Sequence, residues 1–398
     1  MTSPLSPAAE AAGLALSLLL LALPAAAESW KLGGDARYYQ FFQEDDPASQ
    51  RRDAELAILR LKVEGRPLNE VAIEVHGIGQ LTSPPSAPST SIATGTTTQF
   101  LDLSHVPLDR GDLQVMIEVD RLNLAWDQPD FRLVVGRQAI TWGVNFFWPV
   151  LDLFAPFPPQ RIDREYKPGV DAVRLTLPLG SLSEVEVIGA GQGSSLREDG
   201  SVGALVRLHL GAADIGLMAG WFHGDRVAGG FVTANLRGTG LRAEAAFTES
   251  GESPDEIGRE QFWRASAGLD RQLTPSLSLT AEVAWSGFGA SDSRDYPFVA
   301  ASDRVQRGEV TSLGRSHAGT SLAWQAHPLL SLTGSLLLNL GDGSALLLPH
   351  GDWSLSDNVA VVFGAIFGLG PGLRSDGTPG SEYGPAPQTL YAAIKAYF

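Results

Sequence analysis

The sequence predicts an all-β fold: a transmembrane, antiparallel, up-and-down β-barrel of about 18 strands, with 16 as the alternative count. Three observations lead to this prediction. Apolar and polar residues alternate along most of the chain, short and longer connections alternate between these segments, and the chain ends on an aromatic residue, Phe398. Outer-membrane barrels have an even number of strands of about ten residues, short periplasmic turns and longer extracellular loops.

The alternation has a period of two, which is the period at which a strand places side chains on opposite faces. In the segment 276–288, for example, Leu277, Leu279, Ala281, Val283 and Trp285 alternate with Ser278, Thr280, Glu282 and Ser286. Eighteen strands are predicted, near 35–43, 54–65, 70–80, 113–126, 131–141, 169–179, 183–191, 202–210, 213–223, 226–236, 240–249, 260–272, 276–288, 314–326, 329–340, 345–356, 359–369 and 388–398.

The connections separate by length. Short turns such as "DQPD", "RGTG" and "LTPS" fall at every second position, and several of the others are long, including 81–112, 142–168, 289–313 and 371–387. A soluble β-sandwich also alternates, but its loops would not separate in this way. The barrel must close, because a sheet edge in lipid would leave backbone groups without hydrogen bonds.

The N-terminal stretch "AAGLALSLLLLALPAAAES" predicts a secretory signal peptide over residues 1–27. It is an apolar run followed by small residues, and Ala25, Ala26 and Ala27 form a cleavage site of the A-x-A type. The first twelve residues contain Glu10 and no Lys or Arg, which departs from the usual positive start. Residues 28–398 are then predicted to form a single barrel domain.

Composition narrows the class of protein further. Hydrophobic residues make up 44% of the 398-residue chain, but the mean hydropathy of +0.01 excludes a bundle of membrane helices. The net charge of −16 argues against nucleic acid as a partner, because phosphates would be repelled. The chain has no cysteine, which fits an oxidising compartment entered without disulfides.

The last strand, "QTLYAAIKAYF", resembles the C-terminal targeting strand of bacterial outer-membrane barrels. Counting back from Phe398, the outward positions include Ile394 and Leu390. The resemblance implies that Tyr391, Ile394 and Phe398 form a signal read by the barrel-assembly machinery.

One long connection is unusual in composition: "GRQAITWGVNFFWPVLDLFAPFPPQRIDREYKPGVDAVRL", residues 136–175. An aromatic loop exposed to water would be a large apolar patch. We therefore expect 142–168 to fold inward as a constriction loop, with its aromatic residues packed on the inner wall: Trp142, Phe146, Phe147, Trp148, Phe154 and Phe157. Its charged end would line the narrowest point through Arg161, Asp163, Arg164, Glu165 and Lys167.

"GRQ" at 136–138, the charged loop after it and "DAVRL" at 171–175 resemble the signature of alginate-export-like outer-membrane barrels and related porins. The resemblance implies that Arg137, Asp163, Arg164, Asp171 and Arg174 lie at a pore constriction. Arg137 shares the outward parity of Val135, so a bulge near Gly136 would have to turn it inward.

The inward positions predict a lumen of balanced charge. This departs from the alginate exporter, which resembles an arginine-lined tube. The basic residues are Arg60, Lys62, Arg132, Arg174, Arg207, Arg242, Arg264 and Lys395. The acidic residues are Glu64, Glu74, Glu118, Asp120, Glu184, Glu186, Glu244 and Glu282.

Motifs for other chemistry are weak. "GAGQGSS" at 189–195 lacks the helix and Lys-Ser/Thr pair of a phosphate-binding loop. Ser344 and His350 raise the possibility of a barrel hydrolase, but no nucleophile elbow surrounds them, so no enzyme activity is predicted. No His/Cys/carboxylate group has zinc spacing, and "QEDDPASQRRD" is interpreted as solvated loop charge. No metal and no cofactor is predicted.

The sequence thus indicates a bacterial outer-membrane channel, a porin, for passive diffusion of small hydrophilic solutes. Its expected partners are outer-membrane lipid, the barrel-assembly machinery and the solute; the oligomeric state is left open. Two alternatives remain: a substrate-specific exporter of an anionic saccharide, and a structural or adhesive barrel whose lumen is blocked by 142–168. Conductance separates the channels from the structural barrel.

Overall fold

The structure is a computed structural model that describes residues 30–44, 52–84, 99–191, 193, 199–251 and 259–398. The strands of the first half are β1 (Trp30–Glu44), β2 (Arg52–Leu68), β3 (Val71–Ser83), β4 (Ser104–Arg110), β5 (Leu113–Gln128), β6 (Phe131–Gln138), β7 (Val170–Pro178), β8 (Glu184–Gly191) and β9 (Ser201–Leu210). Those of the second half are β10 (Ala213–Phe222), β11 (Asp225–Leu236), β12 (Thr239–Glu249), β13 (Gln261–Thr274), β14 (Leu277–Ser286), β15 (Ser316–His327), β16 (Leu330–Asn339), β17 (Ala345–Ser356), β18 (Val359–Leu369) and β19 (Gln388–Tyr397).

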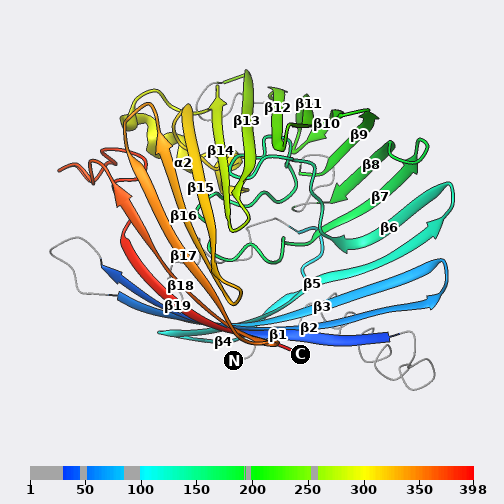
Figure 1. Cartoon of the computed structure of the whole chain (residues 1–398), viewed down its shortest axis with the longest axis horizontal. Coiled ribbons are helices and arrows are strands. Elements are labelled where there is room, and N and C mark those ends of the chain that lie inside the picture. The colour runs from blue at the N-terminus through cyan, green and yellow to red at the C-terminus, as the bar shows by residue number, and fades with distance from the viewer. Residues whose placement is uncertain (1–29, 45–51, 85–98, 192, 194–198, 252–258) are drawn as a thin grey trace.

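Three short helical segments lie between β14 and β15: η4 (Ser293–Asp295), α2 (Tyr296–Ala301) and α3 (Asp303–Gln306). They sit at the rim of the wall that carries the longer connections (Figure 1). Among the described residues, no helix is long and apolar enough to cross a membrane.

Eighteen strands form a closed antiparallel ring that encloses a central space (Figure 1). Apart from β4, each strand pairs with its neighbours in chain order, and β1 pairs with β19 to close the ring. In that closing register Asp35 lies opposite Tyr397, and Gln40 lies opposite Ala392. The predicted closed barrel and its count of 18 strands are confirmed.

The nineteenth strand, β4, was not predicted. It pairs with β5 over residues 113–118, beyond the stretch 122–128 that pairs with β6. Its sequence, "SHVPLDR", has Pro107 near the centre and no regular alternation. Proline cannot donate a ladder hydrogen bond, so this segment lacks the pattern from which strands are recognised.

The two rims of the ring differ in the length of the connections that they carry. Short turns join β2 to β3 at residues 69–70, β5 to β6 at 129–130 and β9 to β10 at 211–212. The opposite rim carries the longer connections, including 139–169, 287–315 and 370–387. One connection at that second rim, residues 223–224 between β10 and β11, is also short.

The outer face of the wall is apolar and is bounded by tryptophan at both rims. On β2, Leu59 and Leu61 are exposed outward, while Arg60 between them is buried toward the interior. Six outward tryptophans are exposed: Trp126, Trp324 and Trp353 near the short-turn rim, and Trp221, Trp263 and Trp285 near the other. An apolar band between two aromatic girdles is the surface that a lipid bilayer requires of a barrel.

The largest apolar core lies between the wall and the chain that connects β6 to β7. This connection, residues 139–169, is called the inner segment below, and it winds across the space that the wall encloses (Figure 1). The core joins Ile140, Trp142, Leu151 and Phe154 of the inner segment to Ile188, Leu205, Phe222 and Ala246 of the wall. The inner segment therefore packs against the inside of the wall and forms the apolar core of the barrel together with it.

Candidate functional site

Two carboxylates of the wall hold the backbone of the aromatic half of the inner segment, residues 140–157. Glu244 on β12 accepts hydrogen bonds from the backbone N–H of Val144, Asn145 and Leu151, the last at 2.9 Å. Glu282 on β14 accepts from the next three N–H groups, those of residues 146–148, at 2.7–3.2 Å. Both carboxylates are nearly inaccessible, 3% exposed, so these charge-assisted bonds satisfy groups that water does not reach.

Aromatic rings of the same half pack against the inner wall. Trp142 makes edge-to-face contacts with Phe154 and with Phe222 of β10, at centroid distances of 5.1 and 5.9 Å. The indole Nε1 of Trp142 donates to Glu186 on β8. A buried tryptophan needs such a polar partner, and the wall supplies it from an inward-facing glutamate.

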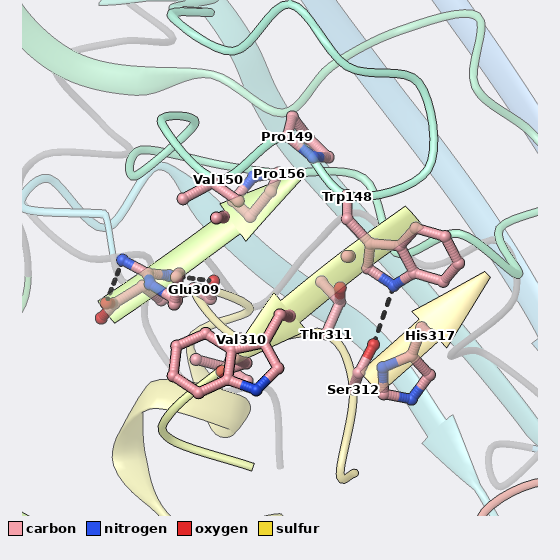
Figure 2. Close-up of a pocket in the computed structure, with 14 residues that line it drawn as sticks. Trp148, Pro149, Val150, Pro156, Glu309, Val310, Thr311, Ser312 and His317 are labelled. Atoms are coloured by element: carbon pink, nitrogen blue, oxygen red, sulfur yellow. Dashed lines mark hydrogen bonds and ion pairs between the residues drawn. The ribbon is translucent and has the colours of Figure 1, made fainter. Parts of the chain in front are cut away.

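Trp148 extends into a small pocket, about 50 Å³, between the inner segment and the long-loop rim (Figure 2). Its Nε1 donates to Ser312 Oγ at 2.9 Å, and its ring lies 5.6 Å from that of His317. Glu309 lies on the far side of this pocket from Trp148 (Figure 2). It forms an ion pair with Arg264 of β13 at 3.0 Å. Directed polar contacts therefore hold the lining of this pocket as well as packing does.

Phe146 departs from the expected packing. It is 47% exposed, whereas Trp142, Phe147 and Phe154 are each 1% exposed. Its ring contacts the Arg164 guanidinium at 4.7 Å and the edge of the Phe147 ring at a centroid distance of 4.8 Å. The backbone N–H of residue 146 is bound by Glu282, which leaves its side chain directed away from the wall.

The charged half of the inner segment, residues 161–169, contacts the opposite part of the wall through ion pairs. Asp163 binds Arg37 of β1 and accepts a hydrogen bond from Tyr39 Oη at 2.9 Å. Burial alone would raise the pKa of the Asp163 carboxyl, but Arg37 and Lys395 outweigh it and bring that pKa to about 2. Asp163 is thus ionised and held in place at neutral pH.

Tyr166 lies among three cations of β1 and β2. The charged groups of Arg37, Arg60 and Lys62 lie 4.8, 4.0 and 4.5 Å from its ring centroid, a cation–π arrangement. The remaining cavity beside it is only about 30 Å³, the volume of one water molecule. The charged half is therefore packed tightly onto this part of the wall.

The other cations of the charged half bind groups of the inner segment itself. Arg161 Nε donates to the Asp163 carbonyl at 2.6 Å, and Lys167 Nζ forms an ion pair with Asp152. Arg164 donates to the carbonyl of Pro159 at 2.6 Å, and burial lowers the pKa of its guanidinium to about 10. Of the five charged residues predicted at a constriction, only Glu165 is exposed, and its side chain is 28% exposed.

Arg137 and Asp171 form a buried ion pair, Nε to Oδ1 at 2.8 Å, between β6 and β7. Arg137 also donates to the carbonyl of Val119, which ties this pair to β5. Gly136 has φ +113°, and a Cβ there would lie 2.2 Å from the Leu122 carbonyl oxygen, so only glycine fits. Both ladders of β6 run through Gly136 without a register shift, so the expected bulge is absent and the positive φ of Gly136 is the irregularity beside Arg137. Arg137 is 1% exposed.

Most of the remaining predicted lumen charges have an opposite charge within reach on the wall. The pairs are Arg60 with Asp120 at 2.6 Å, Arg132 with Asp127 at 3.3 Å, Arg207 with Glu184 at 2.5 Å and Arg242 with Asp270 at 3.1 Å. Glu118 is buried, Arg174 is half-buried, and Glu74 accepts from Asn123 Nδ2 at 2.8 Å. Mutual pairing of this kind leaves little unbalanced charge on the inner face.

The C-terminal strand has the expected faces. Ile394 and Phe398 are exposed outward, 48% and 62%, whereas Tyr391 is buried inward and lies 2.9 Å from His350 Nδ1. The backbone of Phe398 exchanges two hydrogen bonds with Gly34, at 2.8 and 3.0 Å. The last residue therefore takes part in closing the ring.

Some functional candidates were missed and others are dispersed. On β1, Arg37 and Tyr39 bind Asp163 of the charged half, and Asp35 binds Arg37; their i, i+2, i+4 spacing would have placed them on one inward face. Ser344 Oγ accepts from Tyr383 N–H, so Ser344 and His350 have separate partners. Residues 1–27, most of "QEDDPASQRRD" and part of "GAGQGSS" lie outside the described residues.

Several solved structures resemble this barrel. They include OccAB4 of Acinetobacter baumannii (TM-score 0.58, 8% identity, covering 93% of this chain and 98% of that one) and OccAB1 of the same organism (0.55, 11%, 93% and 96%). OccK9 (OpdG) of Pseudomonas aeruginosa gives 0.55 at 13% identity, with coverage of 93% and 98%. No protein-family model and no curated protein matches the chain. At these identities the likeness is one of fold, over nearly the whole length of each chain.

Proposed function

We propose that this chain is a bacterial outer-membrane channel through which small hydrophilic solutes diffuse passively. The observation that carries the proposal is the closed 18-strand wall, apolar outside and charged inside, around an inner segment bound to inward-facing side chains. The structural neighbours OccAB4 and OccK9 are outer-membrane channels, which supports the same function.

In this proposal the inner segment is the constriction. Its aromatic half thickens the wall, and its charged half presents polar groups to the passage; mixed charge at a narrow point orients polar solutes. The residues assigned to the constriction are Arg137, Arg161, Asp163, Arg164, Glu165, Lys167, Asp171 and Arg174. Because Arg137, Asp163 and Asp171 are buried in ion pairs, their role is to position the segment, while Glu165 faces the solute.

Delivery to the membrane is part of the same proposal. Residues 1–27 act as a signal peptide, and Tyr391, Ile394 and Phe398 as the signal for the barrel-assembly machinery. The outward exposure of Ile394 and Phe398 supports this role, because a receptor must reach those side chains.

The main alternative is an exporter of an anionic saccharide. It is supported by the resemblance of residues 136–138 and 171–175 to alginate-export-like barrels. The paired charges of the inner wall favour the general channel instead, because opposite charges in contact cancel at a distance.

The test is a single-channel recording of the refolded protein in planar bilayers, with salts and sugars as solutes. We expect open-channel steps with weak ion selectivity. Strong anion selectivity at moderate salt would favour the exporter, and a complete absence of conductance from a correctly folded barrel would leave the structural barrel.

A further inference from the structure

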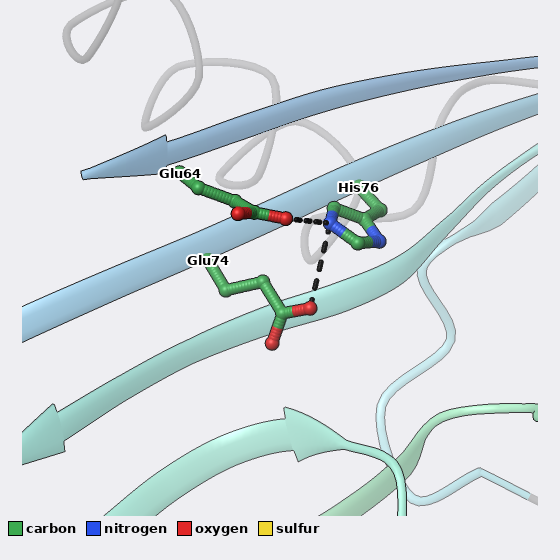
Figure 3. Close-up of side chains that lie close together, drawn as sticks. All are labelled: Glu64, Glu74 and His76. Carbon is green, nitrogen blue, oxygen red and sulfur yellow. Dashed lines mark hydrogen bonds and ion pairs between the residues drawn. The ribbon is translucent and has the colours of Figure 1, made fainter. Parts of the chain in front are cut away.

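Three inward side chains near the short-turn rim converge on one point. Glu64 of β2 and Glu74 and His76 of β3 direct their polar ends toward each other (Figure 3). His76 Nε2 lies 3.3 Å from Glu64 Oε1 and 3.4 Å from Glu74 Oε1. His76 is 5% exposed, so its imidazole is fixed by the wall and its Nε2 points into the cluster.

The two carboxylates lie directly opposite each other in the β2–β3 ladder. Like charges in such a cross-strand pair destabilise a sheet unless a cation lies between them. Within the part of the chain that the structure describes, neither Glu64 nor Glu74 has an ion pair with lysine or arginine. Lys31 lies opposite Glu64 in the β1–β2 ladder but forms no ion pair with it. The two cations opposite His76 bind elsewhere: Lys62 binds Tyr166, and Arg121 binds Asp120.

Histidine cannot replace that cation within the protein. One Nε2–H group can donate one good hydrogen bond, yet two carboxylate oxygens lie at nearly equal, long distances from it. Normal charge-assisted N–H···O bonds are about 2.7–2.9 Å long. Both contacts of His76 are therefore longer than a normal charge-assisted bond, and the two distances are nearly equal.

The two His76 distances suit a shared metal ion, and the ligand atoms of all three residues lie within 4.8 Å of one another. A tetrahedral centre with metal–ligand distances of about 2.0–2.1 Å separates its ligand atoms by roughly 3.3–3.4 Å. We propose that Glu64, Glu74 and His76 form a binding site for a divalent transition cation of the Zn²⁺ type. Imidazole together with carboxylate is a donor set that such ions accept, whereas Mg²⁺ prefers oxygen ligands alone.

Asn123 supports the site from the next strand. It lies opposite Glu74 in the β3–β5 ladder, and its Nδ2 donates to Glu74 Oε2 at 2.8 Å. This bond orients the carboxylate so that Oε1 faces His76, as outer groups do around metal ligands. Three protein ligands leave the fourth position open to water or to a solute in the lumen.

The test is a Zn²⁺ titration of the full refolded barrel by isothermal calorimetry, with Mg²⁺ as the contrasting ion. We expect one zinc per chain and no comparable binding of Mg²⁺. His76→Gln and Glu64→Gln should each abolish the zinc site, and Asn123→Ala should weaken it about 10–100-fold. The control is His209→Gln, which removes another histidine that is paired with a carboxylate, Asp214, and should leave the zinc affinity unchanged.

Each outcome decides the proposal. Unchanged zinc affinity in His76→Gln, equal binding of Mg²⁺, or loss of binding in His209→Gln would overturn it. Retained heat-modifiability on unheated gels shows that every variant still forms the barrel. The binding measurement is independent of conductance, so the zinc site and the channel function stand or fall separately.

Discussion

The two halves of the inner segment are held by different forces on opposite parts of the wall. Strands β8–β18 bind the aromatic half by ring packing and by carboxylates that accept backbone N–H groups. Strands β1–β5 bind the charged half through ion pairs and cation–π contacts around Asp163 and Tyr166. The same connection therefore contributes an apolar core through one half and a set of ion pairs through the other.

This difference separates stability from selectivity. Contacts of the aromatic half exclude water and bury large rings, each contributing roughly 1.5–3 kcal/mol before the cost of ordering the chain. Contacts of the charged half depend on protonation and sit beside the solute path proposed above. Changes to the first half should mainly alter how firmly the segment is held, and changes to the second should alter what passes.

The largest effect should follow from removing the aromatic half. Replacing 144–160 with a short Gly/Ser linker, together with Glu244→Gln and Glu282→Gln, should raise single-channel conductance markedly while the wall still assembles. The two glutamines avoid unpaired buried carboxylates, which the linker alone would leave behind. Unchanged conductance in a folded variant would place the constriction elsewhere.

Trp142→Ala should weaken the aromatic half next most strongly. The ring is 1% exposed and its indole bonds to Glu186, so truncation removes packing and leaves a buried acceptor. The substitution should lower the free energy of local opening of the segment by roughly 3–5 kcal/mol, which hydrogen exchange can measure. Phe146→Ala is the matched control: that ring is 47% exposed, so its truncation should cost much less. Equal costs would contradict the packing described.

Glu282→Gln should have a smaller effect on the same half. The amide keeps one acceptor oxygen but presents an NH₂ group to backbone donors, so part of the three-residue cradle at 146–148 is lost. We expect the free energy of local opening to fall by about 1–3 kcal/mol. Glu184→Gln, whose side chain is 36% exposed and pairs with Arg207, should change local stability by less than about 1 kcal/mol.

The wall could be predicted from sequence, but the attachment of the inner segment could not. Strands of an open-faced sheet carry a local signal, because lipid and lumen impose alternate residue types along each strand. The parity rule also placed Glu244 and Glu282 inward. These side chains bind residues 99 and 135 positions away, and that attachment depends on how the ring closes, which no local pattern contains.

The Glu64, Glu74 and His76 cluster was missed for the same reason. Zinc motifs are recognised by fixed spacing along one segment, but Glu64 and Glu74 meet across the β2–β3 hairpin. Hairpin register is set by the turn, here with a shift between Gly65 and Leu68, so the pairing is known only once that irregularity is located.

Acid should loosen the charged half selectively. The folded pKa of Asp163, about 2, lies below the ordinary value of 3.8, so its ion pair stabilises the fold above pH 3.8. That stabilisation, roughly 2 kcal/mol, is lost as the pH falls through about 2. Hydrogen exchange between pH 5 and pH 2 should show residues 161–169 opening before 142–151. Asp163→Asn should abolish this difference. Simultaneous opening of both halves in the unmodified protein would contradict the claim that the ion pairs of Asp163 hold the charged half.

The smallest expected effect is a change of selectivity with the structure preserved. Arg161 and Arg164 donate to carbonyl groups, so substituting them would disturb packing as well as charge. Glu165 is exposed, and its carboxylate lies 3.6 Å from Arg37 and from Lys395. It also accepts a hydrogen bond from Tyr397 Oη at 3.2 Å, which the glutamine oxygen can still accept, so Glu165→Gln mainly changes charge. Losing one negative charge should shift the reversal potential in a KCl gradient toward anions.

That shift should depend on salt. It should be clear at 0.01 M, where the screening length is about 30 Å, and small at 0.1 M, where it is about 10 Å. Glu70→Gln makes the same charge change in the exposed turn between β2 and β3 and serves as the control. If both variants shift the potential equally, Glu165 acts through the net charge of the barrel. If only Glu165→Gln shifts it, the charged half lines the path of the ions.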